Sequence, residues 1–236
     1  MRNMEQLTEL LAANPYPGRG ITLGRSADGN RAVVVYFIMG RSENSRNRVF
    51  EETADGICTR AFDESKMTDP SLIIYHPVRT FGRGLVVTNG DQTDTVVEFL
   101  KEGRPFEQAL RTREFEPDGP NWTPRISGLL APDGSYKLSI LKAADAAGSA
   151  CVRETFEYPA LPGTGHFIST YETDGDPLPS FRGEPKTVSL GNESAKALAD
   201  QVWAALNADN KVSLFVRTVE LESGKTETAI INKHQA

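Results

Sequence analysis

Residues 33–38, VVVYFI, are apolar at every position. A strand with one face in water alternates apolar and polar residues, so an unbroken apolar run predicts a strand covered on both faces. The run belongs to a longer β pattern, 31–39, which the turn Asp28-Gly29-Asn30 joins to another at 21–25. This turn sequence is typical of a β-hairpin. A central hairpin that is buried on both faces predicts a layered protein.

The other expected elements surround this hairpin. Further strand patterns cover 71–75, 84–88, 125–131, 136–141, 152–158, 166–171, 212–221 and 226–232. Helical patterns cover 4–11, with Asn3 as the expected N-cap, then residues from about 95 to Gly103, a segment that begins at Pro105, and 195–206. About nine or ten antiparallel strands with segregated helices predict an α+β fold, in which two sheets pack together and helices cover the outside.

Composition excludes several classes of protein. The 236 residues include 26 Lys and Arg against 32 Asp and Glu, a net charge of -6. This balance argues against a nucleic-acid surface or an anionic membrane surface, which require basic faces. No apolar run approaches the roughly 18 residues of a membrane span, and residues 1–6 do not resemble a signal peptide. We therefore expect a cytoplasmic protein, with Cys58 and Cys151 as buried free thiols.

Familiar catalytic motifs are missing from the sequence. The histidines His76, His166 and His234 have no metal-ligand spacing with one another or with the cysteines, which predicts a protein without metal. There is no Gly-x-Ser-x-Gly motif for a nucleophilic serine. The glycines of residues 18–24 have the wrong spacing for a dinucleotide fingerprint, so we expect no such cofactor.

Arginines gather where the first predicted strands end. They are Arg19, Arg25, Arg41, Arg46 and Arg48. The planar guanidinium donates paired hydrogen bonds and keeps its charge, which suits a phosphate group. Ser42 and Asn47 lie among these arginines and offer further short polar donors. A phosphate or ribose site is one interpretation; a solvated basic rim is the other.

Two more polar segments follow strand ends. Residues 88–95, TNGDQTDT, predict a strand end, a turn and a helix start, where backbone N–H groups favour an anion. The alternative is that Thr93 or Thr95 only caps the helix. Glu116 stands in a turn-like stretch, where a carboxylate is ordinarily solvated unless the fold buries it. The ring of Tyr75 is expected in the core, with its hydroxyl reaching a partner.

Together these motifs resemble the archaeal-type IMP cyclohydrolase family. The resemblance rests on Tyr16-x-Gly18-Arg19, Gly24-Arg25, Arg41-Ser42, Asn47-Arg48, Asp69-Pro70, Tyr75, Val87-Thr88-Asn89-Gly90, Thr93-Asp94-Thr95, Thr123-Pro124-Arg125 and Ile168-Ser169-Thr170-Tyr171-Glu172. It implies a four-layer αββα sandwich of two mostly antiparallel sheets, similar to the N-terminal-nucleophile hydrolases but without their nucleophile. The implied domain spans residues 1–236, with 1–15 as an N-terminal helical extension.

The resemblance also implies a reaction. The family closes the ring of 5-formamidoimidazole-4-carboxamide ribotide to give inosine 5′-monophosphate and water, the last step of purine synthesis, without metal or redox cofactor. By position, Tyr75 and Glu116 look like its catalytic pair. The residues that correspond to its substrate-binding set are Arg19, Arg41, Ser42, Asn47, Arg48, Asn89, Thr93, Asp94, Asn121 and Arg125. Trp122 interrupts what resembles an Asn-Thr-Pro-Arg motif, and a homo-oligomer is compatible with the family.

Three other functions stay open at this point. An amidohydrolase acting on a related purine-like ring shares the chemistry and differs in its product. A purine-nucleotide-binding protein without catalysis predicts tight binding and no turnover. A structural or interaction protein predicts no ribotide binding.

Overall fold

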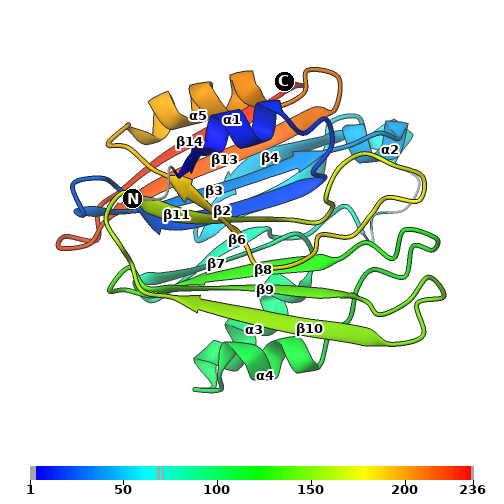
Figure 1. Cartoon of the computed structure of the whole chain (residues 1–236), viewed down its shortest axis with the longest axis horizontal. Helices are drawn as coiled ribbons and strands as arrows, with labels where there is room; N and C mark the ends of the chain where they lie inside the picture. The colour runs from blue at the N-terminus through cyan, green and yellow to red at the C-terminus, as the bar shows by residue number, and fades with distance from the viewer. Residues whose placement is uncertain (1–3, 68–69, 71, 235–236) are drawn as a thin grey trace.

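The computed structural model describes residues 4–67, 70 and 72–234 and contains two seven-stranded sheets (Figure 1). In spatial order, the first sheet has β1 (Glu5–Gln6), β12 (Lys186–Ser189), β11 (Thr164–Ser169), β2 (Arg19–Arg25), β3 (Arg31–Met39), β13 (Lys211–Glu220) and β14 (Thr226–Asn232). The second has β10 (Cys151–Tyr158), β9 (Tyr136–Ala143), β8 (Arg125–Leu130), β7 (Gly84–Thr88), β6 (Val78–Phe81), β5 (Gly56–Ala61) and β4 (Arg48–Thr53). Neighbouring strands pair antiparallel, apart from the parallel pair β1 and β12.

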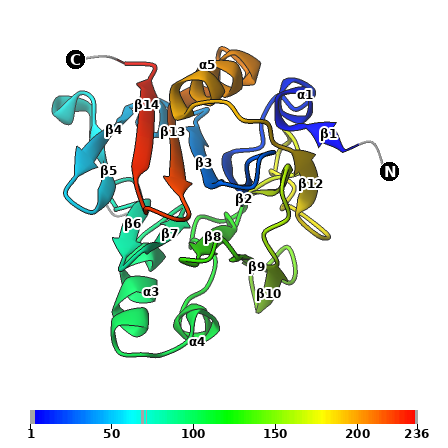
Figure 2. The same cartoon turned by 90° about the vertical axis from the view of Figure 1, so that its left-hand side faces the viewer.

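Helices cover the outer face of each sheet (Figures 1 and 2). On the first sheet lie α1 (Leu7–Ala12) and α5 (Ala195–Ala205); on the second lie α3 (Gln92–Lys101) and α4 (Phe106–Arg111). The short α2 (Glu43–Arg46) and the 3-10 turn η1 (Glu64–Lys66) belong to connections. The α+β class and the two mostly antiparallel sheets are confirmed. No helix within the described ranges is long and apolar enough to cross a bilayer.

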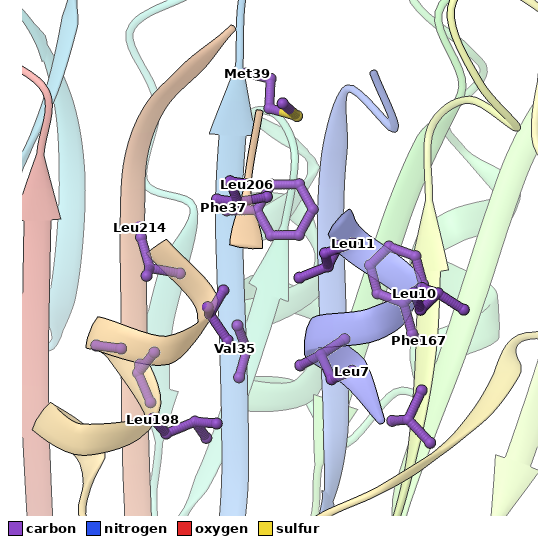
Figure 3. Packing of buried hydrophobic residues seen from close by; sticks show 14 of the residues in the cluster. Leu7, Leu10, Leu11, Val35, Phe37, Met39, Phe167, Leu198, Leu206 and Leu214 are labelled. Atoms are coloured by element: carbon purple, nitrogen blue, oxygen red, sulfur yellow. The ribbon is translucent and has the colours of Figure 1, made fainter. Parts of the chain in front are cut away.

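The run 33–38 of β3 lies in the interior of the first sheet, between β2 and β13, and its side chains enter two different cores. The odd-numbered residues 33–39 pack against α1 and α5 (Figure 3), while the even-numbered residues 34–38 pack between the sheets. All of these side chains are buried. Alternate side chains of a strand point to opposite faces, so the predicted double coverage of this strand is confirmed.

The predicted strand over 71–75 is wrong. The N–H groups of Ile73 and Ile74 both donate to the carbonyl of Pro70, at 3.0 and 2.9 Å, which folds the segment into a turn. Tyr75 follows in a loop, and its carbonyl accepts from the N–H of Thr59 on β5 at 2.9 Å. Local bonds at a proline thus outweigh the apolar pattern. The strands β4, β5, β6 and β12 were not expected from the sequence.

Two helix starts also differ from expectation. The N-terminal helix begins only at Leu7, after the short strand β1, and its N-cap is Gln6. The extension 1–15 is therefore not helical throughout. Helix α3 begins at Gln92 with Asp91 as its N-cap, ahead of both predicted caps. Asn3 and Asp69 lie outside the described residues.

Candidate active site

A cavity of about 320 Å³ is lined by side chains from both sheets and from the loops beside them. Arg19 comes from β2 of the first sheet, and Arg48 begins β4 of the second sheet. Two loops supply much of the remaining wall: residues 41–45 around α2, and residues 115–124, which we call the Glu116 loop. Tyr16, Leu72, Ile73, Tyr171 and Leu178 complete the lining. The volume is in the range of small-molecule sites. The cavity thus depends on chain segments that are far apart in sequence.

Arg48 is buried in this cavity with a partly unpaired guanidinium group. Its side chain is 1 % exposed, and its Nε donates to the carbonyl of Ser45 at 2.8 Å. Both Nη atoms are buried without a hydrogen-bond partner among the described residues. Burial and the neighbouring charge of Arg19 lower the pKa of Arg48. A buried charge without partners is costly, so this group favours an anionic ligand.

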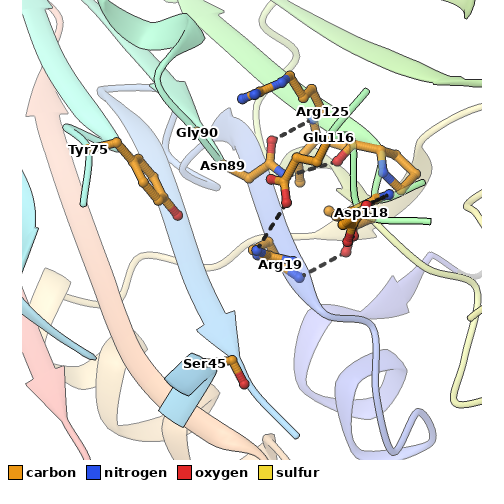
Figure 4. Close-up of polar contacts among 12 residues, drawn as sticks. Arg19, Ser45, Tyr75, Asn89, Gly90, Glu116, Asp118 and Arg125 are labelled. Carbon is orange, nitrogen blue, oxygen red and sulfur yellow. Dashed lines mark hydrogen bonds and ion pairs between the residues drawn. The ribbon is translucent and has the colours of Figure 1, made fainter. Parts of the chain in front are cut away.

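Glu116 faces Arg19 across the cavity (Figure 4). The carboxylate oxygen Oε2 lies 3.7 Å from Arg19 Nη2, and the Glu116 residue is only 3 % exposed. Burial raises the pKa of Glu116, although Arg19 and Arg125 oppose this shift. Burial lowers the pKa of Arg19, but Glu116 and nearby tyrosines outweigh it, so Arg19 stays charged. The carboxyl group is therefore suited to exchange protons closer to neutral pH.

Tyr75 is buried beside this pair, and its hydroxyl lies 3.0 Å from the hydroxyl of Tyr36 on β3. Either oxygen can donate in principle. The Tyr36 hydroxyl is fully buried, and this contact is its one hydrogen bond to the described residues. The Tyr75 hydroxyl has no other hydrogen bond to the described residues either, so one of the two protons bonds within the pair and the other has no protein acceptor there. In Figure 4 the Tyr75 ring extends from its loop toward the side on which Arg19 and Glu116 lie.

A second hydrogen-bonded chain also lines the cavity and was missed by the sequence analysis. The Tyr171 hydroxyl lies 2.6 Å from Oγ1 of Thr123, which in turn donates to Asp118 at 2.5 Å. The Tyr171 ring stacks on Tyr16, with centroids 6.0 Å apart. Burial raises the pKa of Tyr171 to about 12, so its hydroxyl is protonated at neutral pH. Both tyrosines stood in the quoted motifs, but no spacing rule marked them as cavity residues.

The model of the family described as IMP cyclohydrolase-like protein matches residues 16–224. The chain belongs to this family. The IMP cyclohydrolase of Halobacterium salinarum (strain ATCC 700922 / JCM 11081 / NRC-1) is 32% identical over 194 residues, covering 80% of this chain and 85% of the relative. That of Methanopyrus kandleri is 30% identical over 182 residues, covering 70% and 89%. The suspected family is thereby confirmed, and the matched range includes every residue of the cavity.

Three more of the residues that the family resemblance suggested lie at the rim of the cavity. Arg41 pairs with Asp174 at 2.7 Å, and its guanidinium lies 5.1 Å from the ring centroid of Tyr16. Ser42 caps α2 by accepting from the N–H of Ser45. Asn121 accepts from the N–H of Leu178 at 3.0 Å. With Arg19, Arg48 and Glu116, six of the twelve suggested residues line the cavity.

Tyr75 and Arg125 lie behind this lining. Nη1 of Arg125 donates to Gln92 at 2.7 Å and pairs with Asp91 at 2.9 Å. Its charge nevertheless acts on Glu116, because it lowers the pKa of that carboxyl. Figure 4 shows both Arg125 and Tyr75 around the centre formed by Arg19 and Glu116.

Two suggested binding residues, Asn47 and Asp94, lie outside the cavity lining. The Asn47 amide donates to the carbonyl of Asp63 at 2.7 Å and accepts from its N–H at 2.8 Å. Asp94 pairs with Arg79 at 2.9 Å. These side chains have protein partners that hold loops and strands together.

Asn89 and Thr93 also lie away from the lining. The Asn89 amide donates to the carbonyl of Pro124 at 2.9 Å and accepts from the N–H of Ile126 at 2.8 Å. The hydroxyl of Thr93 lies 2.7 Å from that of Thr88. A turn between buried strands needs such partners for its backbone groups, and the sequence pattern alone does not separate this use from ligand binding.

The described residues contain no group of three or more His, Cys, Asp or Glu that could hold a metal ion. Cys58 and Cys151 are both free, as expected. Cys58 is buried, whereas Cys151 is only half-buried, because it begins the edge strand β10.

Proposed function

We propose that this protein is an IMP cyclohydrolase that converts 5-formamidoimidazole-4-carboxamide ribotide into inosine 5′-monophosphate and water in purine biosynthesis. One observation carries the proposal: a single cavity holds the partly unpaired Arg48 and the buried acid Glu116, with the hydroxyl of Tyr75 directly behind them. We take the Tyr75 hydroxyl to accept from Tyr36, so that its own proton is available to the substrate. Relatives that match most of the chain bear the name of this activity.

Ring closure needs a base and an acid on opposite sides of one new bond. The carboxamide nitrogen attacks the formyl carbon, a C–N bond forms, and the nitrogen loses a proton while the formyl oxygen gains one. The intermediate then loses water: its hydroxyl takes up a second proton and the C–O bond breaks, while a ring nitrogen loses its proton and the ring C=N bond forms. We assign the removal of the nitrogen proton to Glu116 and donation toward the formyl oxygen to Tyr75. The raised pKa of Glu116 makes its carboxylate a stronger base for this step.

The ribotide is an anion, and the cavity offers cations for it. We assign an anionic oxygen of the substrate to the two open Nη atoms of Arg48, with Arg19 beside it. Arg41, Ser42 and Asn121 at the rim are assigned to the rest of the ribotide. Orientation of the two reacting groups is the main requirement, because an amide nitrogen is a weak nucleophile.

The finer fold assignment is also a proposal. We infer that residues 1–236 form one domain with the four-layer architecture of the N-terminal-nucleophile hydrolases. Leu7, Leu10 and Leu11 of α1 are buried, because the segment ahead of Tyr16 packs on the outer face of the first sheet. This packing supports a chemistry that differs from that of the N-terminal-nucleophile hydrolases. A reaction that uses Glu116 and Tyr75 needs no N-terminal nucleophile.

Turnover of the formamido ribotide, followed by ultraviolet absorbance, tests the function. Replacing Tyr75 by Phe, or Glu116 by Gln, is expected to lower kcat by about 10²–10⁴, the usual contribution of general acid–base catalysis. Tyr158→Phe and Glu114→Gln serve as matched controls, because both residues lie outside the cavity. Unchanged turnover in both test variants would remove the assigned roles.

Ligand protection separates the other interpretations. Inosine monophosphate at about 100 times its Kd stabilises a binding protein by about 2.7 kcal/mol. Saturable protection without turnover would identify a binding protein, and a different product would identify a related amidohydrolase. If the protein shows neither protection nor turnover, the family match reflects shared ancestry and not a shared function.

A further inference from the structure

Trp122 has a backbone conformation that bulky residues rarely adopt. Its φ is 43°, and it is the one non-glycine residue of the described chain with positive φ. A large side chain in this region is uncommon and persists only where its surroundings impose it. Trp122 belongs to the Glu116 loop and stands between Asn121 and Thr123, which both line the cavity. The surroundings of the indole should therefore explain the conformation.

The indole ring is clamped between two glycine backbones. A Cβ atom added to Gly119 would lie 2.8 Å from the ring, and one added to Gly148 would lie 2.7 Å from it. The indole Nε1 donates to the carbonyl of Ala146 at 3.0 Å. Its edge meets the ring of Phe115, with centroids 5.8 Å apart at 73°. The ring thus joins the residue directly before Glu116 to the connection between β9 and β10.

That connection is itself well tied. The carboxylate of Asp145 accepts from the N–H groups of Ala147 and Ser149, at 2.9 and 3.1 Å. The N–H of Ala144 donates to the carbonyl of Ala150 at 2.9 Å. Gly148 therefore faces Trp122 from a fixed turn of the second sheet, which can serve as an anchor.

The Glu116 loop also bonds to other segments: Asn121 accepts from Leu178, Pro124 accepts from Asn89, and Thr123 contacts the Tyr171 hydroxyl. The Glu116 N–H donates to the carbonyl of Thr123 at 2.9 Å, and the Thr123 N–H donates to Asp118 at 2.6 Å. The two internal bonds shape the loop, and none of these bonds attaches it to the β9–β10 turn. We propose that Trp122 is a positioning residue, whose indole docks the Glu116 loop on the β9–β10 turn and so holds Glu116 against Arg19.

The charge around Glu116 comes from four groups. Arg19 of β2, Arg48 of β4 and Arg125 of β8 face the carboxyl, together with Asp118 of the same loop. Burial is the largest influence and raises the pKa of Glu116. A loop released from its anchor admits water to the carboxyl, so its pKa is expected to fall toward the usual glutamate range.

The test perturbs the clamp from both sides. Trp122→Ala and Trp122→Phe change the indole itself, whereas Gly148→Ala places a methyl group against it from the anchor. Gly82→Ala is the matched control, because Gly82 also has positive φ, +57° against +66° for Gly148, but its Cβ would meet nothing within 4 Å. If Trp122→Ala fails to fold, the same measurements are made on Trp122→Phe and Gly148→Ala.

The expected effect on turnover rests on the proposed function. We expect kcat to fall at least tenfold in Trp122→Ala and Gly148→Ala, because a loop displaced by about 1 Å or less misplaces the Glu116 carboxylate. KM should change less than kcat, because Arg48, Arg41 and Ser42 belong to other elements and Asn121 is the one assigned ribotide contact in this loop. Gly82→Ala should retain wild-type kcat. Equal kcat in all of these proteins would overturn the inference.

A second readout does not depend on turnover. The pKa of Glu116 is measured by titrating its ¹³C-labelled carboxyl resonance, assigned with Glu116→Gln. We expect a lower pKa in Trp122→Ala and Gly148→Ala, and no change in Gly82→Ala. An unmoved pKa in both test variants overturns the positioning role, whatever happens to turnover. A lowered pKa in a protein that never turns over the ribotide supports the positioning role and refutes the proposed function instead.

Discussion

At the scale of single residues, Arg48 is a buried cation whose guanidinium group is only partly paired. An arginine that is 1 % exposed, with both Nη atoms unpaired among the described residues, weakens the unliganded protein. Its neighbour Arg19 adds like charge and contributes to lowering its pKa. Such a group is retained where a ligand supplies the missing acceptors, so stability and binding should respond in opposite directions when it is replaced.

Arg48→Met removes the charge while it keeps most of the side-chain volume. We expect the free energy of unfolding of the unliganded variant to rise by about 1–4 kcal/mol, as in other replacements of buried charges by apolar groups. Protection by inosine monophosphate should disappear. Thermal unfolding with and without the nucleotide measures both effects. A variant that is destabilised yet still protected would show that Arg48 serves the fold alone.

Tyr36→Phe removes the proposed donor to Tyr75 without exposing a new polar group. We expect kcat to fall by about tenfold and KM to change little, because the variant acts on the Tyr75 hydroxyl and not on the ribotide contacts. The matched control is Tyr136→Phe, whose hydroxyl bonds to His166 instead. If the control loses as much kcat as the test variant, the effect does not arise from Tyr75.

Glu116 should make stability depend on pH. Its pKa is raised in the folded protein, so its contribution to stability is full below the unfolded pKa of about 4.3 and is lost as pH rises through the folded value. The Tm of Glu116→Gln relative to wild type is therefore expected to increase from pH 4 to pH 8. Thermal scans across this range measure the difference, and a difference that shrinks with rising pH contradicts the assigned shift.

At the scale of elements, the β7–α3–β8 connection shows how polar residues serve the fold. Asn89 follows β7 and holds the start of β8 through Pro124 and Ile126, and Gln92 of α3 donates to the same amide oxygen at 3.0 Å. Gln92 in turn accepts from Arg125. This network fixes where β8 begins and places Arg125 near Glu116.

Asn89→Ala breaks the network at its centre. We expect the free energy of unfolding to fall by about 1–3 kcal/mol, since the buried N–H of Ile126 loses its partner. Ribotide affinity, corrected for the folded fraction, should remain close to wild type, because Asn89 does not line the cavity. Urea unfolding and a binding titration measure these quantities. Loss of affinity in a fully folded variant would restore Asn89 to the binding set.

At the scale of the whole molecule, the two sheets form the site only when they are packed together. Arg19 comes from one sheet and Arg48 from the other, and the core between the sheets holds them at a fixed separation. Leu23 is fully buried in this core, on the same strand as Arg19. The site should therefore be sensitive to the packing between the sheets.

Leu23→Ala is expected to lower the free energy of unfolding by about 2–5 kcal/mol, through lost burial and the cavity it leaves. Leu161→Ala is the control, because Leu161 is 57% exposed, and should change stability by less than about 0.5 kcal/mol. Denaturant unfolding of both variants measures the difference. Equal effects would show that the space between the sheets is not the main core.

The sequence by itself determined the α+β class, the doubly covered strand β3, most long strands and the family. Periodicity and turn chemistry are local, so they survive without knowledge of distant contacts. It also singled out Arg19, Arg48 and Glu116, whose residue types match the chemistry of the cavity. The segment 71–75 was misassigned, because its apolar residues form a turn on Pro70.

Only the tertiary structure decided which polar residues face the cavity. Asn47 and Asn89 resemble binding residues in sequence, yet their side-chain amides donate hydrogen bonds to backbone carbonyls of other segments. Tyr171 and Arg48 line one cavity although 122 residues lie between them in the sequence. Burial and unpaired donors arise from contacts between distant segments, and those contacts are set by how the two sheets pack.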